Sequence, residues 1–243
     1  MNCRIIAFSL SLILSWMTAS GSQHTGNLSY SNDVSYGFDA LALNDATGWR
    51  AYSDLSWTVS DEEAGAPAGF DWLYSYTIDT EKFAPVRWVI ETGAGFTLDN
   101  IDPDTIQVAQ EGTAIAYDPA VKLSFGTFES TGDSGDRRDM PGTRYGMFFD
   151  DTGAGGNNTT ITTVTFWSDV APAWGDLYAN CGGNGNRGWN SGFTTLNPTD
   201  AASDGTILNH VLTPGVIPEP ASAIMIGFGT GLIALIRRFY SRT

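Results

Sequence analysis

Cysteine is nearly absent from the chain, which excludes a fold held together by disulfides. Only Cys3 and Cys181 occur in 243 residues. Cys3 lies in an N-terminal apolar segment with the features of a cleaved leader, so Cys181 is expected to be the only cysteine of the mature protein. An intrachain disulfide is then impossible, and stability has to come from a packed core. The remaining thiol is expected to be buried, the alternative being pairing with another chain.

Histidine is also scarce, which argues against nucleophilic catalysis. The segment Gly132-Asp133-Ser134-Gly135 superficially resembles the nucleophile sequence of trypsin-like proteases. A catalytic serine needs a base to take its proton and an acid to orient that base. The only histidines are His24 and His210, and neither lies in a recognisable triad motif. We therefore predict no catalytic residue and a protein that is not an enzyme.

Basic residues are few, and those at the chain ends leave the middle strongly acidic. The whole chain has 12 Lys and Arg against 27 Asp and Glu, a net charge of −15. Without Arg4, Arg237, Arg238, Arg242 and Glu219, residues 22–214 keep 8 basic and 26 acidic side chains, a net charge of −18. Such a surface repels nucleic acid and anionic lipid headgroups. We expect no nucleic-acid partner.

Residues 1–21 have the three parts of a secretory signal peptide. A short N-terminal region carries Arg4, an apolar stretch runs from Ile5 to Met17, and small residues follow up to Gly21. This pattern predicts cleavage after Gly21, or after Ser20 as the alternative. The chain is therefore expected to be exported.

Between the two ends, residues 22–214 read as one all-β domain. Short runs of alternating apolar and polar residues are separated by Gly, Asp, Asn and Pro, and no convincing amphipathic helix occurs before residue 215. About nine runs predict an antiparallel β-sandwich that is jelly-roll-like in its number of strands. The expected strands are Leu55–Val59, Trp72–Ile78, Val86–Glu91, Thr105–Ala109, Val121–Phe125, Arg144–Phe149, Thr160–Trp167, Leu177–Ala179 and Ile207–Leu212.

Residues 215–243 contain a proline-rich neck, an apolar run and a basic end. Pro218 and Pro220 flank Glu219 and keep this neck extended and without two backbone donors. The uncharged run Ala221–Ile236 would rise about 24 Å as a helix, somewhat less than a bilayer core of ~30 Å. The arginines that follow place the C-terminus in the cytoplasm. We predict a single transmembrane helix over residues 221–236, the alternative being a buried core helix.

This tail resembles a PEP-CTERM sorting signal, also called the ice-binding protein C-terminal domain. The resemblance rests on Pro218, Glu219 and Pro220, the short Gly-rich helix, and Arg237 with Arg238. It implies an exosortase, a membrane-embedded cysteine transpeptidase, as the processing partner. It also implies transient anchoring in the inner membrane, delivery to the cell surface or outside the cell, and association with exopolysaccharide or biofilm.

Two further residues in the tail are candidate packing positions. Gly227 and Gly231 form a small-xxx-small pair in the apolar run. Such pairs let a second helix approach closely, so they are expected to pack against the processing enzyme. Because glycine is common in membrane spans, the pair has a second interpretation without any partner.

Acidic residues in glycine-rich loops are candidate calcium ligands. One group consists of Asp133, Asp136 and Asp139, and the other of Asp150, Asp151 and Asn157. Calcium prefers six to eight oxygen ligands, and extracellular loops often supply them. Neither group has EF-hand spacing, and Arg137 and Arg138 inside the first group favour ion pairs as the alternative there. No other cofactor is expected.

An aromatic segment is the candidate carbohydrate site. Trp174, Tyr178 and Trp189 lie close in sequence to several asparagines. Sugar rings stack on exposed aromatic rings while amides bind their hydroxyl groups. The alternative is that these rings fill the core of the sandwich.

Three functions remain open from the sequence. The leading one is an exported, non-enzymatic surface or extracellular-matrix protein associated with exopolysaccharide. The second is a carbohydrate-binding module that uses the aromatic segment. The third is a glycoside hydrolase, which needs two carboxylates roughly 5 to 10 Å apart, and no motif selects such a pair.

Overall fold

The computed structural model describes residues 21–30, 38–41, 49, 52–131, 137, 139–153, 160–182 and 185–215. Residues 1–20 of the proposed signal peptide lie outside these ranges, as does the apolar run 221–236. The same holds for the tail residues Pro218, Glu219, Pro220, Gly227, Gly231, Arg237 and Arg238. Within the described ranges, no helix has the length and apolar character needed to cross a bilayer.

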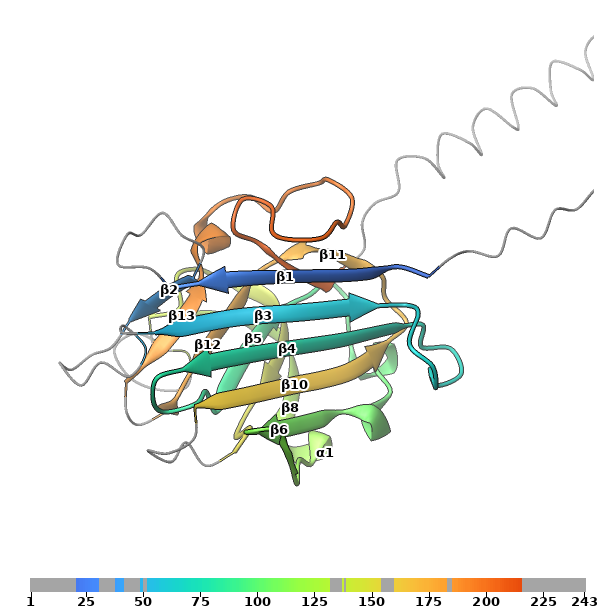
Figure 1. The fold of residues 1–243 in the computed structure, drawn as a ribbon, viewed down its shortest axis with the longest axis horizontal. Helices are drawn as coiled ribbons and strands as arrows, with labels where there is room; N and C mark the ends of the chain where they lie inside the picture. Colours follow the sequence, from blue (N-terminus) through green and yellow to red (C-terminus); the bar gives the residue numbers. More distant parts are fainter. Residues whose placement is uncertain are drawn as a thin grey trace, which may run out of the picture.

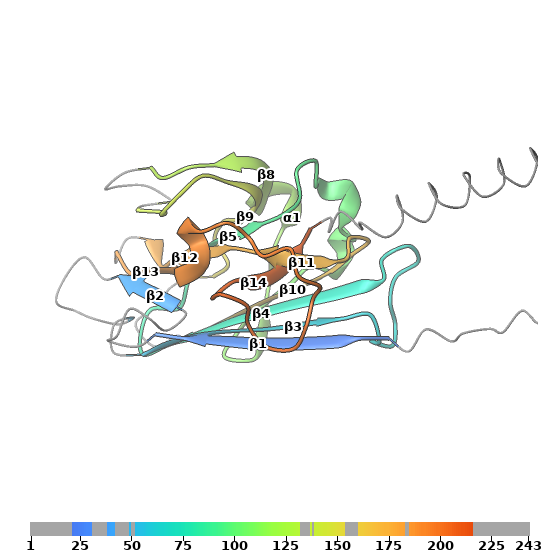
Figure 2. The ribbon, with the colours of Figure 1, turned by 90° about the horizontal axis from the view of Figure 1, so that it is seen from above.

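Two six-stranded antiparallel sheets form the two layers of the molecule (Figures 1 and 2). The front sheet, nearest the viewer in Figure 1, has the strand order β1 (Gln23–Ser29), β3 (Ser53–Ser60), β4 (Trp72–Thr80), β10 (Ile161–Ser168), β6 (Gln107–Gln110) and β7 (Thr113–Ile115). The back sheet has the order β2 (Phe38–Leu41), β13 (Arg187–Asn190), β12 (Leu177–Asn180), β5 (Arg87–Glu91), β9 (Arg144–Phe149) and β8 (Leu123–Phe128).

A small third sheet and four short helical turns complete the described fold. The small sheet pairs β11 (Pro172–Gly175) with β14 (Val211–Pro214). The helical turns are η1 (Leu98–Asn100), η2 (Pro103–Thr105), α1 (Pro119–Lys122) and η4 (Ser191–Thr194). The prediction of an all-β, sandwich-like fold is therefore confirmed.

All nine expected strands have a counterpart, but the sheets contain more strands than the sequence indicated. The run expected at 144–149 coincides with β9, while the run expected at 207–212 overlaps β14 only in its last two residues. Strands β1, β2, β7, β11 and β13 were not expected. The jelly-roll-like number of strands is exceeded, since the two large sheets hold twelve strands among the described residues against about eight in a jelly roll.

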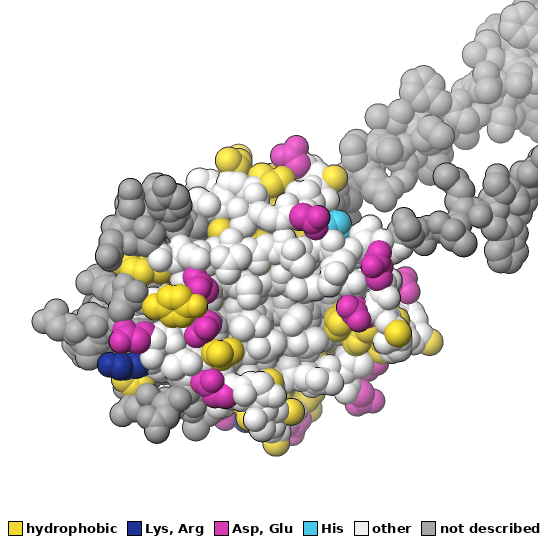
Figure 3. Space-filling model, viewed as in Figure 1, with side chains coloured by type: hydrophobic (Ala, Val, Ile, Leu, Met, Phe, Trp, Pro, Cys, Tyr) yellow, Lys and Arg dark blue, Asp and Glu magenta, His cyan; other side chains and the backbone are white. Residues whose placement is uncertain are grey.

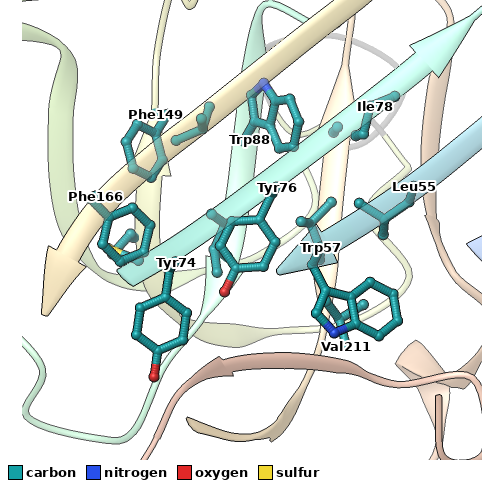
Figure 4. Close-up of a cluster of buried hydrophobic side chains, with 14 of the residues drawn as sticks. Leu55, Trp57, Tyr74, Tyr76, Ile78, Trp88, Phe149, Phe166 and Val211 are labelled. Atoms are coloured by element: carbon teal, nitrogen blue, oxygen red, sulfur yellow. The ribbon is translucent and has the colours of Figure 1, made fainter. Parts of the chain in front are cut away.

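Alternation along the front strands builds the core between the two sheets. On β4, the alternate residues Tyr74, Tyr76 and Ile78 are fully buried. The side chains of Tyr74 and Phe166 stack with ring centroids 5.4 Å apart (Figure 4). The hydroxyl groups of these two tyrosines also have acceptors, because Tyr74 Oη donates to Val170 O and Tyr76 Oη to Leu212 O, both at 2.8 Å. The phenol groups thus enter the core without an unsatisfied donor.

The back sheet and the small sheet supply the opposite side of the same core. Their fully or nearly fully buried side chains include Trp88, Ile90, Met147, Phe149, Leu177, Val211 and Leu212. Gly146 on β9 is required here, since a Cβ at this position would lie 2.1 Å from the carbonyl oxygen of Ile90 on β5.

The outer face of the front sheet carries small uncharged side chains in register. One row crosses four strands through Thr25, Thr58, Ser75 and Thr165. The neighbouring row crosses the same strands through Asn27, Ser56, Thr77 and Thr163. Hydroxyl groups meet within the rows, with Oγ of Ser75 and Oγ1 of Thr165 3.2 Å apart and the Oγ1 atoms of Thr77 and Thr163 2.9 Å apart. We call these two rows the hydroxyl face.

Candidate functional site

The aromatic residues proposed to bind sugar are mostly part of the core. Trp174 on β11 is 3% exposed and Tyr178 on β12 is fully buried. Trp189 on β13 is partly buried and stacks on Tyr178, with ring centroids 6.5 Å apart and ring planes 15° from parallel. Neither Trp174 nor Tyr178 offers a ring face to a sugar, so the alternative of core packing is correct for these two residues.

The acidic loop residues that the structure describes are each engaged with a basic side chain. Asp150 pairs with Arg87 at 2.8 Å, Asp151 with Lys122 at 2.9 Å, and Asp139 with Arg187. Asp133, Asp136 and Asn157 lie outside the described residues. In the described part of the chain, no group of three or more His, Cys, Asp or Glu side chains is placed to hold a metal ion.

A buried cluster of charged and polar residues, unexpected from the sequence, lies where five segments meet. Its members are Glu91 at the end of β5, Arg144 at the start of β9, Asp176 between β11 and β12, Asn190 at the end of β13, and His210 just before β14. We call it the Asp176 cluster. The five residues are spread over 120 positions of the chain, and antiparallel pairing of β12 with both β5 and β13 brings three of the segments together.

Asp176 is the centre of this cluster. Its side chain is fully buried, and its two oxygens face donors on both sides. Oδ2 accepts from Nε of Arg144 at 2.7 Å and forms an ion pair with Nη2 of the same guanidinium at 2.7 Å. Oδ1 accepts from Nδ2 of Asn190 at 2.7 Å and from Nδ1 of His210 at 3.0 Å. Burial alone would raise the pKa of Asp176. The hydrogen bonds from His210 and Asn190 and the charge of Arg144 hold it below its usual value.

Glu91 lies beside Asp176 and shares its basic partner. The Oε2 atom of Glu91 is 3.4 Å from Nε of Arg144 and accepts from Nδ2 of Asn197 at 3.1 Å. Burial and the negative charge of Asp176 raise the pKa of Glu91 from 4.5 to about 7, against the opposing effects of Asn197 and Arg144. One arginine cannot neutralise two buried carboxylates, so this glutamic acid takes up a proton near neutral pH.

A hydroxyl, an imidazole and a carboxylate are linked in the same order as in serine hydrolases. Oγ1 of Thr195 is 3.1 Å from Nε2 of His210, whose Nδ1 is 3.0 Å from Oδ1 of Asp176. The tautomer with its proton on Nδ1 donates to Asp176 and accepts at Nε2. However, Thr195 Oγ1 also lies 2.8 Å from the carbonyl oxygen of Gly192, and a hydroxyl has only one hydrogen to donate. The shorter contact favours a bond within the helical turn over activation by the imidazole.

The two carboxylates do not have the arrangement of a glycosidase. Glycoside hydrolysis needs a roughly 5 to 10 Å gap between two carboxylates that holds the sugar bond. Here both carboxylates bind the same guanidinium, and the side chain of Asp176 is 0% exposed. Glu91 and Asp176 therefore bind Arg144 and a proton, and this arrangement leaves no space between them for a sugar bond.

The Asp176 cluster anchors the irregular segment 191–210 to the sandwich. Nδ2 of Asn190 donates to the carbonyl of Asn209 at 2.9 Å, and Nη2 of Arg144 donates to the carbonyl of Phe193. The guanidinium of Arg144 also lies over the ring of Phe193, 4.4 Å from its centroid. Both ends of the segment are thus fixed by residues of the back sheet.

Comparison with known proteins adds no relative, since no family model matches the chain and neither a curated protein nor a solved structure is similar to it.

Proposed function

We propose that this protein is an exported, non-enzymatic component of the cell surface or extracellular matrix, associated with exopolysaccharide. The observation that carries the proposal is the tail, in which Pro218, Glu219 and Pro220 precede an uncharged run and the pair Arg237 and Arg238. By its resemblance to PEP-CTERM signals, the tail would hold the chain in the inner membrane, with the C-terminus in the cytoplasm, until an exosortase-type enzyme processes it.

The extent of the sandwich supports this proposal. The first described strand begins at Gln23 and the last one ends at Pro214. The proposed signal peptide ends at residue 21, and the proline neck begins at residue 218. Cleavage at either place would leave every described strand intact, as delivery of a folded domain requires.

The proposed ends of the chain have separate roles. Residues 1–21 would be the signal peptide, removed on export. Residues 221–236 would form the transmembrane helix, with Phe239 and Tyr240 at the membrane interface compensating for its short length. Gly227 and Gly231 would let this helix pack closely against the processing enzyme.

Intact-mass analysis of the protein recovered from its native envelope tests the proposal. We expect a mature chain that begins at Gly21 or Ser22 and ends near Pro218–Pro220, with any group attached by the transpeptidase visible as added mass. Recovery from the cytosol with both ends intact would overturn the proposal.

A variant pair makes the same experiment specific for the neck. P218A with P220A removes both prolines, and the chain should then keep its tail and stay in the membrane fraction. P198A changes a proline in the loop before β14 and should be processed like the unchanged chain. Equal processing of the two variants would remove the role assigned to the neck.

A further inference from the structure

The hydroxyl face is an open surface that the described chain leaves uncovered. The small sheet and α1 lie on the other side of the front sheet (Figure 2). In a domain with a net charge of −18, the middle of this face shows no acidic or basic side chain, and the acids gather around it (Figure 3). Neighbouring strands place these side chains about 4.8 Å apart across the sheet and about 6.7 Å apart along a strand.

An exposed aromatic ring lies at one end of the hydroxyl face. Tyr52 precedes β3 by one residue, and its side chain is on the same side of the sheet as Asp54 because alternate residues share a face. Tyr52 is 43% exposed, and its hydroxyl lies 3.4 Å from Oδ2 of Asp79. The ring of Tyr52, the carboxylates of Asp54 and Asp79 and the two rows of the hydroxyl face therefore form one continuous surface.

The two aspartates beside Tyr52 occupy a costly position. Asp54 and Asp79 are directly opposite each other on β3 and β4, and like charges in such a pair destabilise a sheet. Burial and the charges of Asp54 and Glu111 raise the pKa of Asp79, while the hydrogen bond from Tyr52 lowers it. An opposed pair of acids costs sheet stability, and costly pairs of this kind are expected at functional sites.

We propose that the hydroxyl face, together with Tyr52, Asp54 and Asp79, binds a neutral polysaccharide chain. The inference rests on the proposed function and names the class of partner and the surface that contacts it. The ring of Tyr52 is a stacking platform for a sugar, the aspartates accept hydrogen bonds from sugar hydroxyls, and the Ser and Thr rows both donate and accept.

The negative charge beside the hydroxyl face favours a neutral polymer as the ligand. Asp54, Asp79 and Glu111 would repel uronic acids, sulfates and nucleic acid alike. A neutral glycan meets no such repulsion, and its hydroxyl groups satisfy the carboxylates. A second copy of this chain would bring two pairs of aspartates together, which disfavours self-association through this face.

Affinity electrophoresis of the full-length protein in gels that contain a neutral glucan, with alginate as the anionic comparison, tests the proposal. We expect retardation by at least one neutral glucan. Y52A should weaken binding by about tenfold, the loss expected for one stacked ring. T77K places a long charged side chain in the middle of the face and should weaken binding at least as much. T127K is the matched control on β8 of the back sheet and should bind like the unchanged protein.

Melting temperature separates lost binding from lost folding, and Y52A remains informative if T77K fails to fold. Retardation only by alginate, or equal retardation of Y52A and the unchanged protein, would overturn the proposal. So would a dimer that T77K dissociates, or retention in growing ice that T77K abolishes, because either would assign the face to another partner. The assay is independent of export and processing, so its failure is distinct from failure of the proposed function.

Discussion

At the scale of single residues, the arrangement around Asp176 shows how a sandwich core tolerates a carboxylate. Four donors from Arg144, Asn190 and His210 surround it. A buried charge without its partners costs several kcal/mol, whereas a fully satisfied one fixes the geometry of the groups around it. The side chain of Asp176 therefore connects strands of the back sheet to the segment 191–210.

Replacing Asp176 should be among the most destabilising single changes in the protein. D176N keeps the shape but removes the charge that Arg144 needs, and it places an NH2 group against other donors. We expect a loss of about 3 to 5 kcal/mol in the free energy of unfolding, measured with urea. K122A breaks the exposed pair with Asp151 and is the control, with an expected loss of about 1 kcal/mol or less. Equal effects of the two changes would contradict the role of the Asp176 cluster.

Glu91 should make stability depend on pH near neutrality. Its pKa is about 7 in the folded protein, against 4.5 as its ordinary value. The folded state therefore binds more protons between these values, and the stability this provides is complete below pH 4.5 and lost as pH rises through 7. The difference in pKa corresponds to at most about 3 kcal/mol.

The variant E91Q mimics the protonated form and tests this dependence. It should match the unchanged protein at pH 4 and be more stable at pH 8, as measured by urea unfolding at both pH values. E62Q, at an exposed position after β3, should leave the pH profile unchanged. If E91Q and the unchanged protein have parallel profiles from pH 4 to 8, Glu91 does not control this transition.

At the scale of the elements, the long alternating strands are predicted from the sequence, whereas several short or edge strands are not. Strands β3, β4 and β10 alternate over eight or nine residues, and all three were expected. Strand β1 has only Leu28 as a buried apolar residue in seven, because it is an edge strand whose other side faces water. Strands β11 and β13 contain Pro172, Gly175 and Gly188, which read as turn residues in a sequence. These strands form because they pair with neighbouring strands, and their local composition alone does not indicate them.

The same limit applies to the sites. Trp174 and Tyr178 have the composition of a sugar site, but composition cannot tell which side of a strand faces the core. The Asp176 cluster joins residues from 91 to 210, and no local spacing connects them. The hydroxyl face was visible only as the threonines of β10, since its rows run across strands and depend on register.

Close contact between β5 and β9 depends on a glycine. G146A would place a methyl group 2.1 Å from the carbonyl oxygen of Ile90 and 3.0 Å from Cα of Glu91. Backbone atoms cannot rotate away, so the two strands must separate, and we expect a loss of about 1 to 3 kcal/mol in the free energy of unfolding. G142A meets its nearest neighbour at 3.5 Å and should change stability by less than about 1 kcal/mol. Identical melting curves for the two variants would contradict this account of the contact.

At the scale of the whole molecule, the buried apolar side chains of the described residues all lie away from the two ends of the chain. Among the described residues, the buried apolar side chains run from Leu28 to Leu212. The net charge of −18 over residues 22–214 favours solubility of such a domain, and neither proposed processing site falls within this range. Removing both ends should therefore leave the core unchanged.

A chain of residues 22–215 should accordingly fold as well as the full-length protein. Because it keeps every described strand, we expect its thermal midpoint within about 3 °C of that of the full chain, followed by circular dichroism. Ending the chain at residue 210 is the control. It removes the fully buried Val211 and Leu212 and the carbonyl that accepts from the hydroxyl of Tyr76, so this shorter chain should fail to fold. If the chain that ends at residue 210 folds, β14 is not needed to close the core. If the chain of residues 22–215 fails to fold, residues outside this range are needed for folding.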